Sequence, residues 1–238
     1  MKALVKKILK STLVGRTVYP LVQKAYLLYA IPMKQRRLRR YGVEALKRMH
    51  ALLSSNGVPY YCDAGTLLGF YRDKRFMPHD LDMDIAILEG SIKPARLLKL
   101  FIDAGYGYVH GFDYKGQFLM FTVSDPSGIT LDVFFQTLQK GSETILDAWG
   151  LYWFENRSYP SETANTVISY PYLKPTGLRP LDVLGTVTMI PENVKEVLTS
   201  EFGPWETPDP TFSHDSMPHT EWPDFGYRLT KEEALAHP

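Results

Sequence analysis

The sequence of 238 residues contains a single cysteine, Cys62, and no long hydrophobic run. One cysteine excludes a disulfide within the chain, and it also excludes a cysteine-rich zinc site. No apolar run approaches the roughly 20 residues that a membrane-spanning helix needs. The basic start is followed by no convincing small-residue cleavage site, so we expect no signal peptide. These absences favour a reducing compartment, and we expect a cytoplasmic protein.

The overall composition is ordinary, with 45% hydrophobic and 22% charged residues, as in soluble globular proteins. The net charge of +1, however, conceals an asymmetry. Residues 1–49 carry 13 Lys or Arg and one acid, a net +12, whereas residues 50–238 carry 14 basic and 25 acidic residues, a net −11. Such a split indicates a basic arm that meets an anionic partner.

This basic arm, residues 1–40, mixes aliphatic side chains with lysines and arginines, and we expect Pro20 and Pro32 to interrupt it. One interpretation is a basic amphipathic helix on an anionic membrane surface, which would make the protein peripheral on the inner face of the membrane. The alternative is a helix that packs on the domain with its basic face in solvent. No groove-reading motif is visible, so we do not expect nucleic acid as a partner.

Periodicity and turn residues predict an α+β domain of mixed α/β order over residues 41–210. Helices are predicted over residues 41–55, 67–71, 93–105 and 193–203. Strands are predicted over residues 58–62, 81–88, 106–114, 117–125 and 128–138, with a further hairpin within 146–159. The C-terminal tail, residues 211–238, is rich in Pro, Asp and His and is predicted to be an ordered loop at best.

Three aspartates, Asp80, Asp82 and Asp84, alternate along what is predicted to be a buried strand. Residues i, i+2 and i+4 share one face of a strand, so the carboxylates should point one way and the apolar residues between them the other. Like charges this close raise one another's pKa, and oxygen ligands select Mg²⁺, Mn²⁺ or Ca²⁺ over zinc. The alternative is an exposed edge strand that uses charge to prevent aggregation.

A fourth aspartate, Asp132, stands between Leu131 and Val133 in an apolar predicted strand. A carboxylate in such a run is costly to bury unless it is paired or binds a metal. If its strand neighbours that of Asp84, Asp132 can complete the ligand set. The alternative is a strand-end carboxylate that caps a loop.

Gly65 and Thr66 lie between a predicted strand and a predicted short helix. A glycine at this point lets the backbone approach a phosphate, and the start of the helix attracts anions. The hydroxyl of Thr66 either adds a ligand contact or caps the helix.

The order of these segments resembles the LicD/fukutin-related phosphotransferase family, which has a nucleotidyltransferase-like mixed sheet flanked by helices. The family pattern G-[ST]-L-L-G-x-x-R stands here as residues 65–72, and P-W-D-x-D-x-D stands as residues 78–84. The strand around Asp132 is similar to the family's third-aspartate strand. The similarity covers residues 46–210, with His79 in place of the usual Trp, and leaves the basic arm outside the pattern.

This resemblance implies transfer of a phospho-alcohol, such as phosphocholine or phosphoribitol, from a CDP-activated donor. The acceptor would be a hydroxyl of a glycan or lipid-linked glycan, in cell-surface polysaccharide synthesis. The implied cofactor is Mg²⁺ or Mn²⁺, with Asp82, Asp84 and Asp132 as its ligands. Asp132 is also the implied base that activates the acceptor hydroxyl.

The resemblance further implies that Gly65, Thr66, Arg72 and Asp80 contact the substrate. Arg72 is a candidate phosphate clamp, because a guanidinium suits the geometry of a phosphate. The alternative for Arg72 is a salt bridge to Asp80 or Asp73, since arginine pairs with carboxylates as readily. For Asp80 we expect a supporting carboxylate close to the metal.

Three other interpretations compete with this one. A nucleotidyltransferase proper, which adds a nucleoside monophosphate to a small molecule or sugar, would use the same aspartates. A glycosyltransferase with a D-x-D metal site is a second alternative, against which the Gly65-Thr66 segment argues. The third is a membrane-associated scaffold without activity, and the intact set of aspartates argues against it.

Overall fold

A computed structural model describes residues 13–138, 143–150, 164–212 and 217–238 of the chain. Its helices are α2 (Leu13–Ser55), α3 (Ala64–Leu68), the π-helical turn η1 (Gly69–Asp73), α4 (Pro94–Asp103), α5 (Val194–Phe202) and α6 (Lys231–Ala236). Its strands are β1 (Tyr61–Cys62), β2 (Met83–Leu88), β3 (Gly107–Tyr114), β4 (Gln117–Ser124), β5 (Thr130–Leu138), β6 (Thr144–Gly150), β7 (Ala164–Leu173), β8 (Leu178–Val183), β9 (Thr186–Pro191) and β10 (Thr220–Leu229). This content confirms the predicted mixed α/β class.

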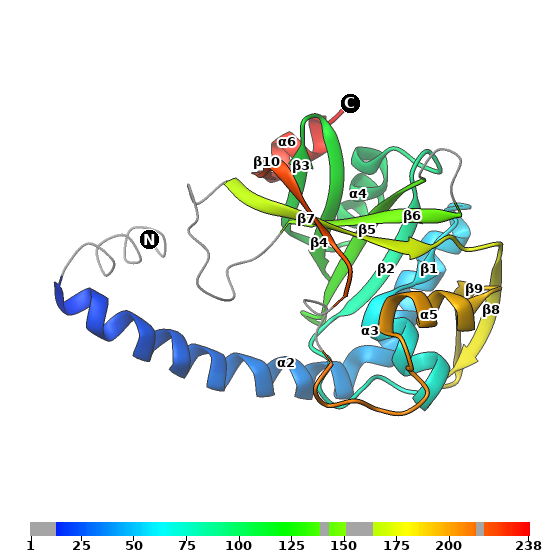
Figure 1. The fold of residues 1–238 in the computed structure, drawn as a ribbon, viewed down its shortest axis with the longest axis horizontal. Helices are drawn as coiled ribbons and strands as arrows, with labels where there is room; N and C mark the ends of the chain where they lie inside the picture. Colours follow the sequence, from blue (N-terminus) through cyan, green and yellow to red (C-terminus); the bar gives the residue numbers. More distant parts are fainter. Residues whose placement is uncertain (1–12, 139–142, 151–163, 213–216) are drawn as a thin grey trace.

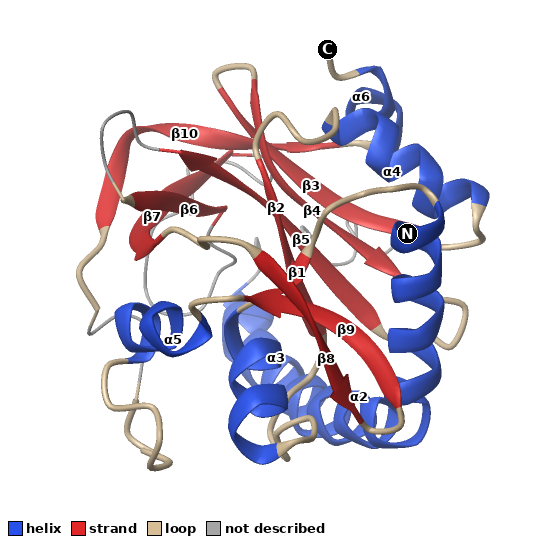
Figure 2. Ribbon diagram, turned by 90° about the vertical axis from the view of Figure 1, so that its right-hand side faces the viewer, coloured by secondary structure: helices blue, strands red, loops and turns tan. Residues whose placement is uncertain are grey.

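Eight strands form one mixed sheet in the order β1-β2-β5-β4-β3-β10-β7-β6. β2 and β5 are parallel, and the other pairs are antiparallel. β6 also pairs with β5, so the hydrogen-bonded pairing closes into a ring of six strands, β5, β4, β3, β10, β7 and β6. β8 and β9 form a separate two-stranded sheet. Figures 1 and 2 show α2 and α4 on one side of the large sheet.

The main hydrophobic core lies between the large sheet and these helices. Met49 of α2 is fully buried in one cluster with Ile85 of β2 and Val133 of β5. Burying a side chain of this size stabilises the fold by about 1.5–3 kcal/mol. Because side chains alternate along a strand, Asp84 and Asp132 point to the opposite face of the sheet, away from this core.

α2 is continuous, and this corrects the prediction that Pro20 and Pro32 interrupt the basic arm. A proline removes one helical hydrogen bond and can bend a helix without ending it. The inner half of α2 is held by buried residues such as Leu38 and Leu46, whereas the outer half projects from the domain (Figure 1). The predicted boundary between residues 40 and 41 falls inside this helix. Within the described ranges, α2 and the other helices lack an apolar stretch that would cross a bilayer.

β2 begins at Met83, so the prediction that Asp80, Asp82 and Asp84 share one strand is wrong for the first two. The backbone N–H of Asp80 donates to the carbonyl of Met77 at 3.1 Å, which makes a turn instead of an extended segment. Only Asp84 lies in the strand. β2 is flanked by β1 and β5, so the exposed-edge alternative does not describe it.

The C-terminal tail is not a loop, which is a third correction. β10 lies between β3 and β7 in the large sheet, and α6 follows it. α6 begins with a capping box in which Thr230 accepts from the N–H of Glu233, and the Glu233 carboxylate accepts from the N–H of Thr230. Near the chain end, His237 contacts the carboxylate of Asp113 at 2.8 Å. The tail is therefore an integral part of the domain.

The remaining predicted elements are present and differ at their ends, whereas β7 and β8 lie where no strand was predicted. β3, β4, β5, α4 and α5 lie where they were expected. The strand predicted over 58–62 is shortened to β1, and the short helix starts earlier and continues as η1. The predicted hairpin within 146–159 is described only up to Gly150, where β6 pairs with β7, and the remainder lies outside the described residues.

Candidate active site

Four polar residues form one row across four neighbouring strands. Asp84 of β2 is paired with Asp132 of β5, Asp132 with Thr122 of β4, and Thr122 with His110 of β3. Neighbouring strands lie about 4.8 Å apart, so the four side chains stand in sequence on one sheet face. We call these four residues the polar row. The strands of Asp84 and Asp132 are therefore neighbours, which is the condition under which Asp132 can join the ligand set.

Asp84 is held by the segment that contains the Gly-Thr pair. The Thr66 hydroxyl accepts from the Asp84 N–H at 2.9 Å and donates to Asp84 Oδ2 at 3.3 Å. The N–H of Asp63 donates to the Asp84 carbonyl at 3.1 Å. The N-cap of α3 is Asp63, so the alternative that Thr66 caps this helix is wrong. Thr66 is 2% exposed, and its hydroxyl positions Asp84.

Gly65 lies directly against the carboxylate of Asp80. A Cβ atom at Gly65 would stand 3.4 Å from Asp80 Oδ1 and 3.3 Å from Met77 Cε. Asp80 Oδ2 accepts a hydrogen bond from the Met77 N–H at 2.8 Å. The glycine thus lets the α3 segment and the aspartate turn pack closely, which brings Asp80 beside the start of α3.

Burial and mutual repulsion dominate the electrostatics of the aspartates. Burial, followed by the charges of Asp82 and Asp132, raises the pKa of Asp84 well above its ordinary value. Burial and then Asp82 raise the pKa of Asp132 to about 7, against a hydrogen bond from Thr122. Burial raises the pKa of Asp80 to about 6. The four carboxylates therefore form one acidic cluster that favours a positive ligand.

Lys34, within the basic arm, contributes positive charge to this cluster. Its ammonium lies 3.5 Å from the hydroxyl of Thr130, which is two residues before Asp132 and on the same face of β5. Burial raises the pKa of Asp82, and the charge of Lys34 lowers it. Among the described Lys and Arg side chains, Lys34 included, none forms an ion pair with Asp82 or Asp132. The inner part of α2 is thus a wall of the candidate site.

Arg72 forms the salt bridge that was the alternative to a phosphate clamp. Its Nε and Nη2 donate to the two carboxylate oxygens of Asp73 at 2.8 and 2.9 Å. Its Nη1 donates to the carbonyl of Trp205 at 3.1 Å, which ties η1 to the segment after α5. In this arrangement Arg72 stabilises the fold, and its contact with substrate stays a prediction.

Sequence reasoning missed Thr122, His110 and Lys34. Thr122 is 2% exposed, and a polar residue within an apolar predicted strand was the available signal for it. Burial, followed by the charges of Arg228 and Lys34, lowers the pKa of His110 to about 4. His110 is therefore a neutral imidazole at pH 7. Its link to Asp132 depends on strand register, which the sequence pattern does not contain.

The donor set of the cluster fits a hard divalent cation in its chemistry. Asp82, Asp84 and Asp132 offer only carboxylate oxygens, the ligands that Mg²⁺ and Mn²⁺ prefer. Over the described ranges, no three His, Cys, Asp or Glu side chains stand close enough together to hold one ion. An ion bound by these three aspartates would therefore have to draw their carboxylates together.

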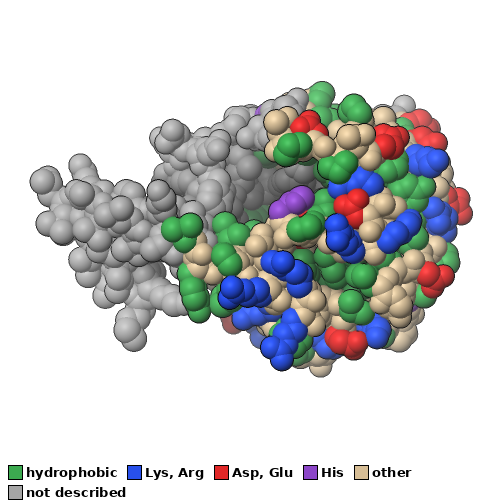
Figure 3. Space-filling view, turned by 90° about the horizontal axis from the view of Figure 1, so that it is seen from below, with side chains coloured by type: hydrophobic (Ala, Val, Ile, Leu, Met, Phe, Trp, Pro, Cys, Tyr) green, Lys and Arg blue, Asp and Glu red, His purple; other side chains and the backbone are tan. Residues whose placement is uncertain are grey.

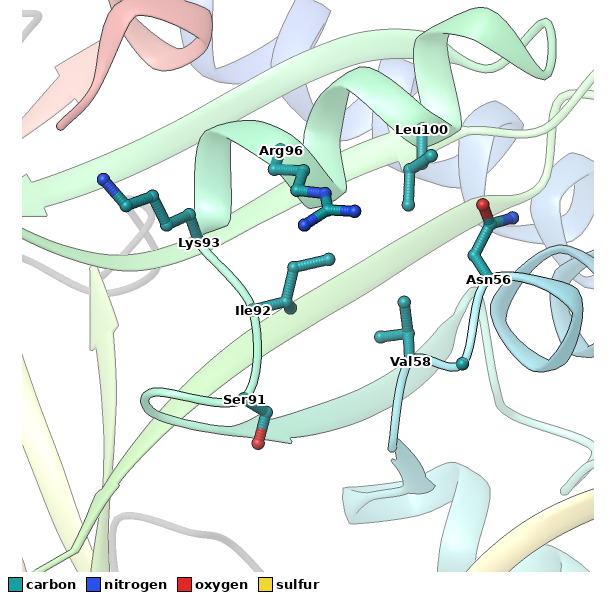
Figure 4. Close-up of a pocket in the computed structure, with 8 residues that line it drawn as sticks. Asn56, Val58, Ser91, Ile92, Lys93, Arg96 and Leu100 are labelled. Carbon is teal, nitrogen blue, oxygen red and sulfur yellow. The ribbon is translucent and has the colours of Figure 1, made fainter.

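A surface cavity of about 350 Å³ lies away from the aspartates. Figure 4 shows its lining, which comes from the segment between α2 and β1, the turn after β2 and the start of α4. The lining includes Asn56, Val58, Ser91, Lys93, Arg96 and Leu100. It opens at the end of β2 opposite to Asp84, so it does not belong to the candidate site.

Comparisons with known proteins assign the chain to a family whose domain agrees with this mixed fold. The family model described as "LicD/FKTN/FKRP, nucleotidyltransferase domain" matches residues 57–193, which contain Asp82, Asp84 and Asp132. This match covers more than half of the chain. The chain therefore belongs to the LicD/FKTN/FKRP family of nucleotidyltransferase domains, as the resemblance of its motifs predicted.

Individual relatives are distant and are matched in part. A human protein named ribitol-5-phosphate transferase FKTN is 31% identical over 97 residues, which is 41% of this chain and 21% of that protein. An uncharacterized protein of Rickettsia typhi is 28% identical over 119 residues, 49% of this chain and 36% of that protein. An uncharacterized protein of Rickettsia prowazekii is 38% identical over 64 residues, 26% of this chain and 24% of that protein. The alignment thus spans about a fifth of the human relative.

Proposed function

We propose that this protein is a metal-dependent phosphotransferase that moves a phospho-alcohol from a CDP-activated donor onto a glycan hydroxyl. The observation that carries the proposal is the paired register of Asp84 and Asp132, with Asp82 beside them and Lys34 on the same side. Membership of the LicD/FKTN/FKRP family supports it. The name of the human relative favours phosphoribitol among the alcohols, with phosphocholine as the other class to test.

In this reaction the acceptor oxygen forms a bond to the phosphorus that carries the alcohol. The bond from that phosphorus to the bridging oxygen breaks, and CMP leaves. Asp132 takes the proton of the acceptor hydroxyl, because burial and the charge of Asp82 make its carboxylate more basic than a free aspartate in the cation-free site. A divalent cation bound by Asp82, Asp84 and Asp132 would offset the diphosphate charge and lower the pKa of the attacking hydroxyl.

The other residues orient these groups. Thr66 holds the backbone and the Oδ2 atom of Asp84, so that carboxylate has a fixed direction. Lys34 supplies an ammonium that a phosphate oxygen of the donor can approach, because no ion pair occupies it among the described residues. Phosphoryl transfer depends mainly on such positioning and on charge stabilisation.

The first test is CMP release from CDP-ribitol, CDP-choline, CDP-glycerol and CDP-ethanolamine with Mg²⁺ or Mn²⁺ and a glycan acceptor. We expect metal-dependent release from one donor, and a loss of at least about 100-fold in Asp82→Asn and Asp84→Asn, as expected when a metal ligand is removed. Asp103→Asn is the matched control, because Asp103 is an exposed partner of Lys99 on α4. Release that survives in both ligand variants would contradict the proposal, and chelation by EDTA should abolish it.

A nucleotidyltransferase proper is the second candidate, because the family model describes a nucleotidyltransferase domain. That enzyme would release pyrophosphate from a nucleoside triphosphate, whereas the proposed enzyme releases CMP. Measuring both products with the same preparation separates the two reactions. A D-x-D glycosyltransferase would instead release a nucleoside diphosphate from a sugar nucleotide.

We also propose that the outer half of α2 binds an anionic membrane surface at the inner face, near a lipid-linked acceptor. Leu28 and Tyr29 are 69% and 71% exposed, and Ile31 is 38% exposed. Lys and Arg side chains gather on the face seen in Figure 3, where α2 runs. Apolar and basic groups together favour an anionic bilayer surface.

This membrane proposal is tested by point variants, since deleting residues 1–40 would also remove Lys34 and the buried Leu38. Leu28→Glu and Ile31→Glu are expected to reduce sedimentation with vesicles that contain anionic lipid, and to leave the melting temperature unchanged. Vesicles of neutral lipid are the control. Unchanged sedimentation of the double variant would refute a membrane role for this helix.

A further inference from the structure

The polar row contains a hydrogen-bonded chain that ends on Asp132. The Thr122 hydroxyl donates to Asp132 Oδ1, and the same hydroxyl oxygen lies 2.9 Å from His110 Nε2. Thr122 is 2% exposed, so water does not compete for its hydroxyl. The three residues occupy directly paired positions on β3, β4 and β5, so the backbone ladder fixes the spacing between them.

The direction of this chain follows from a count of protons. When Asp132 is ionised, as a carboxylate that binds a cation must be, it can only accept, so the single proton of the Thr122 hydroxyl points to Asp132. His110 Nε2 must then carry the proton that it donates to the Thr122 oxygen. Burial lowers the pKa of His110 to about 4, so the imidazole is neutral and has one N–H to donate while Asp132 is ionised.

We propose that Thr122 and His110 are positioning residues for Asp132. The Thr122 hydroxyl binds Oδ1 of Asp132 and leaves Oδ2 for the cation or the acceptor proton. His110 donates to the Thr122 oxygen, so that the Thr122 proton is directed to Asp132. This inference rests on the proposed role of Asp132 in the reaction. It parallels the hydrogen bonds that orient metal-bound carboxylates in other sites, where their loss costs about 10- to 100-fold in metal affinity or activity.

At the opposite end of the polar row, Asp84 is held by a threonine hydroxyl in the same way. Thr66 donates to Asp84 Oδ2, as Thr122 donates to Asp132 Oδ1. Each aspartate of the paired strands is thus bound through one carboxylate oxygen by a buried threonine. The other oxygen of each remains for a ligand that lies between or above the two strands. This symmetry argues that the hydroxyls orient the carboxylates and do not merely fill space.

The test compares Thr122→Val, which keeps the shape and removes the hydroxyl, with Thr122→Ser, which keeps the hydroxyl. Mn²⁺ binding to the full chain is measured by calorimetry, so the readout needs no donor substrate. We expect the dissociation constant to rise about 10- to 100-fold in Thr122→Val and to recover most of the way in Thr122→Ser. Thr137→Val is the matched control, because Thr137 lies on β5 outside the row and accepts from Gln117.

His110→Phe is the second variant, and it removes the donor to Thr122 without touching the aspartates. We expect it to weaken Mn²⁺ binding by less than Thr122→Val, and to lower kcat more than it changes the KM for the donor. Equal losses in Thr122→Val and Thr122→Ser would overturn the inference, because packing would then explain the effect. Unchanged Mn²⁺ affinity in Thr122→Val and His110→Phe would also overturn it.

The outcomes separate this inference from the proposed reaction. If wild type cleaves none of the CDP-alcohols while Thr122→Val still loses Mn²⁺ affinity and Thr122→Ser regains it, the positioning role stands and the reaction falls. If the reaction is found and the threonine variants behave like wild type, the positioning role falls alone. A wild-type protein that neither binds Mn²⁺ nor transfers a phospho-alcohol would overturn both.

Discussion

Gly69, the second glycine of the Gly65–Arg72 segment, is needed for close approach and not for an unusual backbone angle. Its φ is −61°, which any residue adopts, but a Cβ atom there would stand 2.7 Å from the carbonyl oxygen of Arg75. A backbone atom cannot move aside as a side chain can. The glycine therefore lets η1 turn back tightly toward the aspartate segment.

We predict that Gly69→Ala destabilises the fold by about 1–3 kcal/mol, the usual effect of overpacking a rigid site. Urea unfolding measures the change. Gly107→Ala is the control, because its nearest neighbour to a new Cβ is 3.9 Å away, and it should stay within about 0.5 kcal/mol of wild type. Equal stability of Gly69→Ala and wild type would show that the Arg75 carbonyl can move.

Single functional residues could be predicted from the sequence where a polar side chain interrupts an apolar segment. Asp132 was found because a carboxylate interrupts an apolar strand, and its pairing with Asp84 agrees with that reasoning. Thr122 and His110 were not found, because their importance arises from cross-strand register. Lys34 was placed in a solvent-facing or membrane-facing arm, since sequence distance conceals its contact with Thr130.

At the scale of elements, the turn between β4 and β5 fastens the inner half of α2 to the domain. Asp125 is 3% exposed and accepts from the Ser127 hydroxyl at 2.6 Å and from the N–H groups of Ser127 and Ile129 at 2.9 and 3.0 Å. Arg48 of α2 donates to its other carboxylate oxygen. Burial raises the pKa of Asp125, but these hydrogen bonds outweigh it and hold the pKa below its ordinary value. The same turn leads into β5 and toward Asp132.

We predict that Asp125→Asn lowers the free energy of unfolding by about 1–3 kcal/mol at pH 7, since charge-assisted bonds become neutral ones. A carboxylate with a lowered folded-state pKa stabilises the fold above its unfolded pKa of about 3.9, and this contribution is lost as pH falls through the folded value. The difference between wild type and Asp125→Asn should therefore be constant from pH 5 to 7 and shrink below about pH 4. Asp103→Asn, at an exposed ion pair, should show little difference at any pH.

At the scale of the whole molecule, the C-terminal residues complete the sheet. β10 pairs on one side with β3 and on the other with β7, and Ala234 of α6 is fully buried. The sequence concealed this strand, because Pro223 and a bulge between Glu221 and Phe225 break its alternation. Long-range pairing, which no local pattern contains, overrides these local signals.

We predict that a chain ending at residue 219 does not fold cooperatively, because β3 and β7 lose the strand that joins them. Thermal unfolding followed by circular dichroism tests this. The milder variant Thr230→Ala removes the capping hydroxyl of α6 and should cost about 0.5–2 kcal/mol without loss of cooperativity. A truncated chain with the wild-type melting temperature would show that β10 is dispensable.

Because α2 is continuous, the distance between its outer end and the candidate site is fixed. The helix begins at Leu13, 21 residues before Lys34, which corresponds to about 30 Å of straight helix at 1.5 Å per residue. Because a continuous helix is stiff, a surface that binds its outer end also fixes the distance between that surface and the aspartates. An acceptor hydroxyl would have to lie at that distance from the surface, and inserting two helical turns into α2 would increase the distance by about 10 Å. The number of residues in the outer part of α2 would then determine how far from its anchor an acceptor hydroxyl can react.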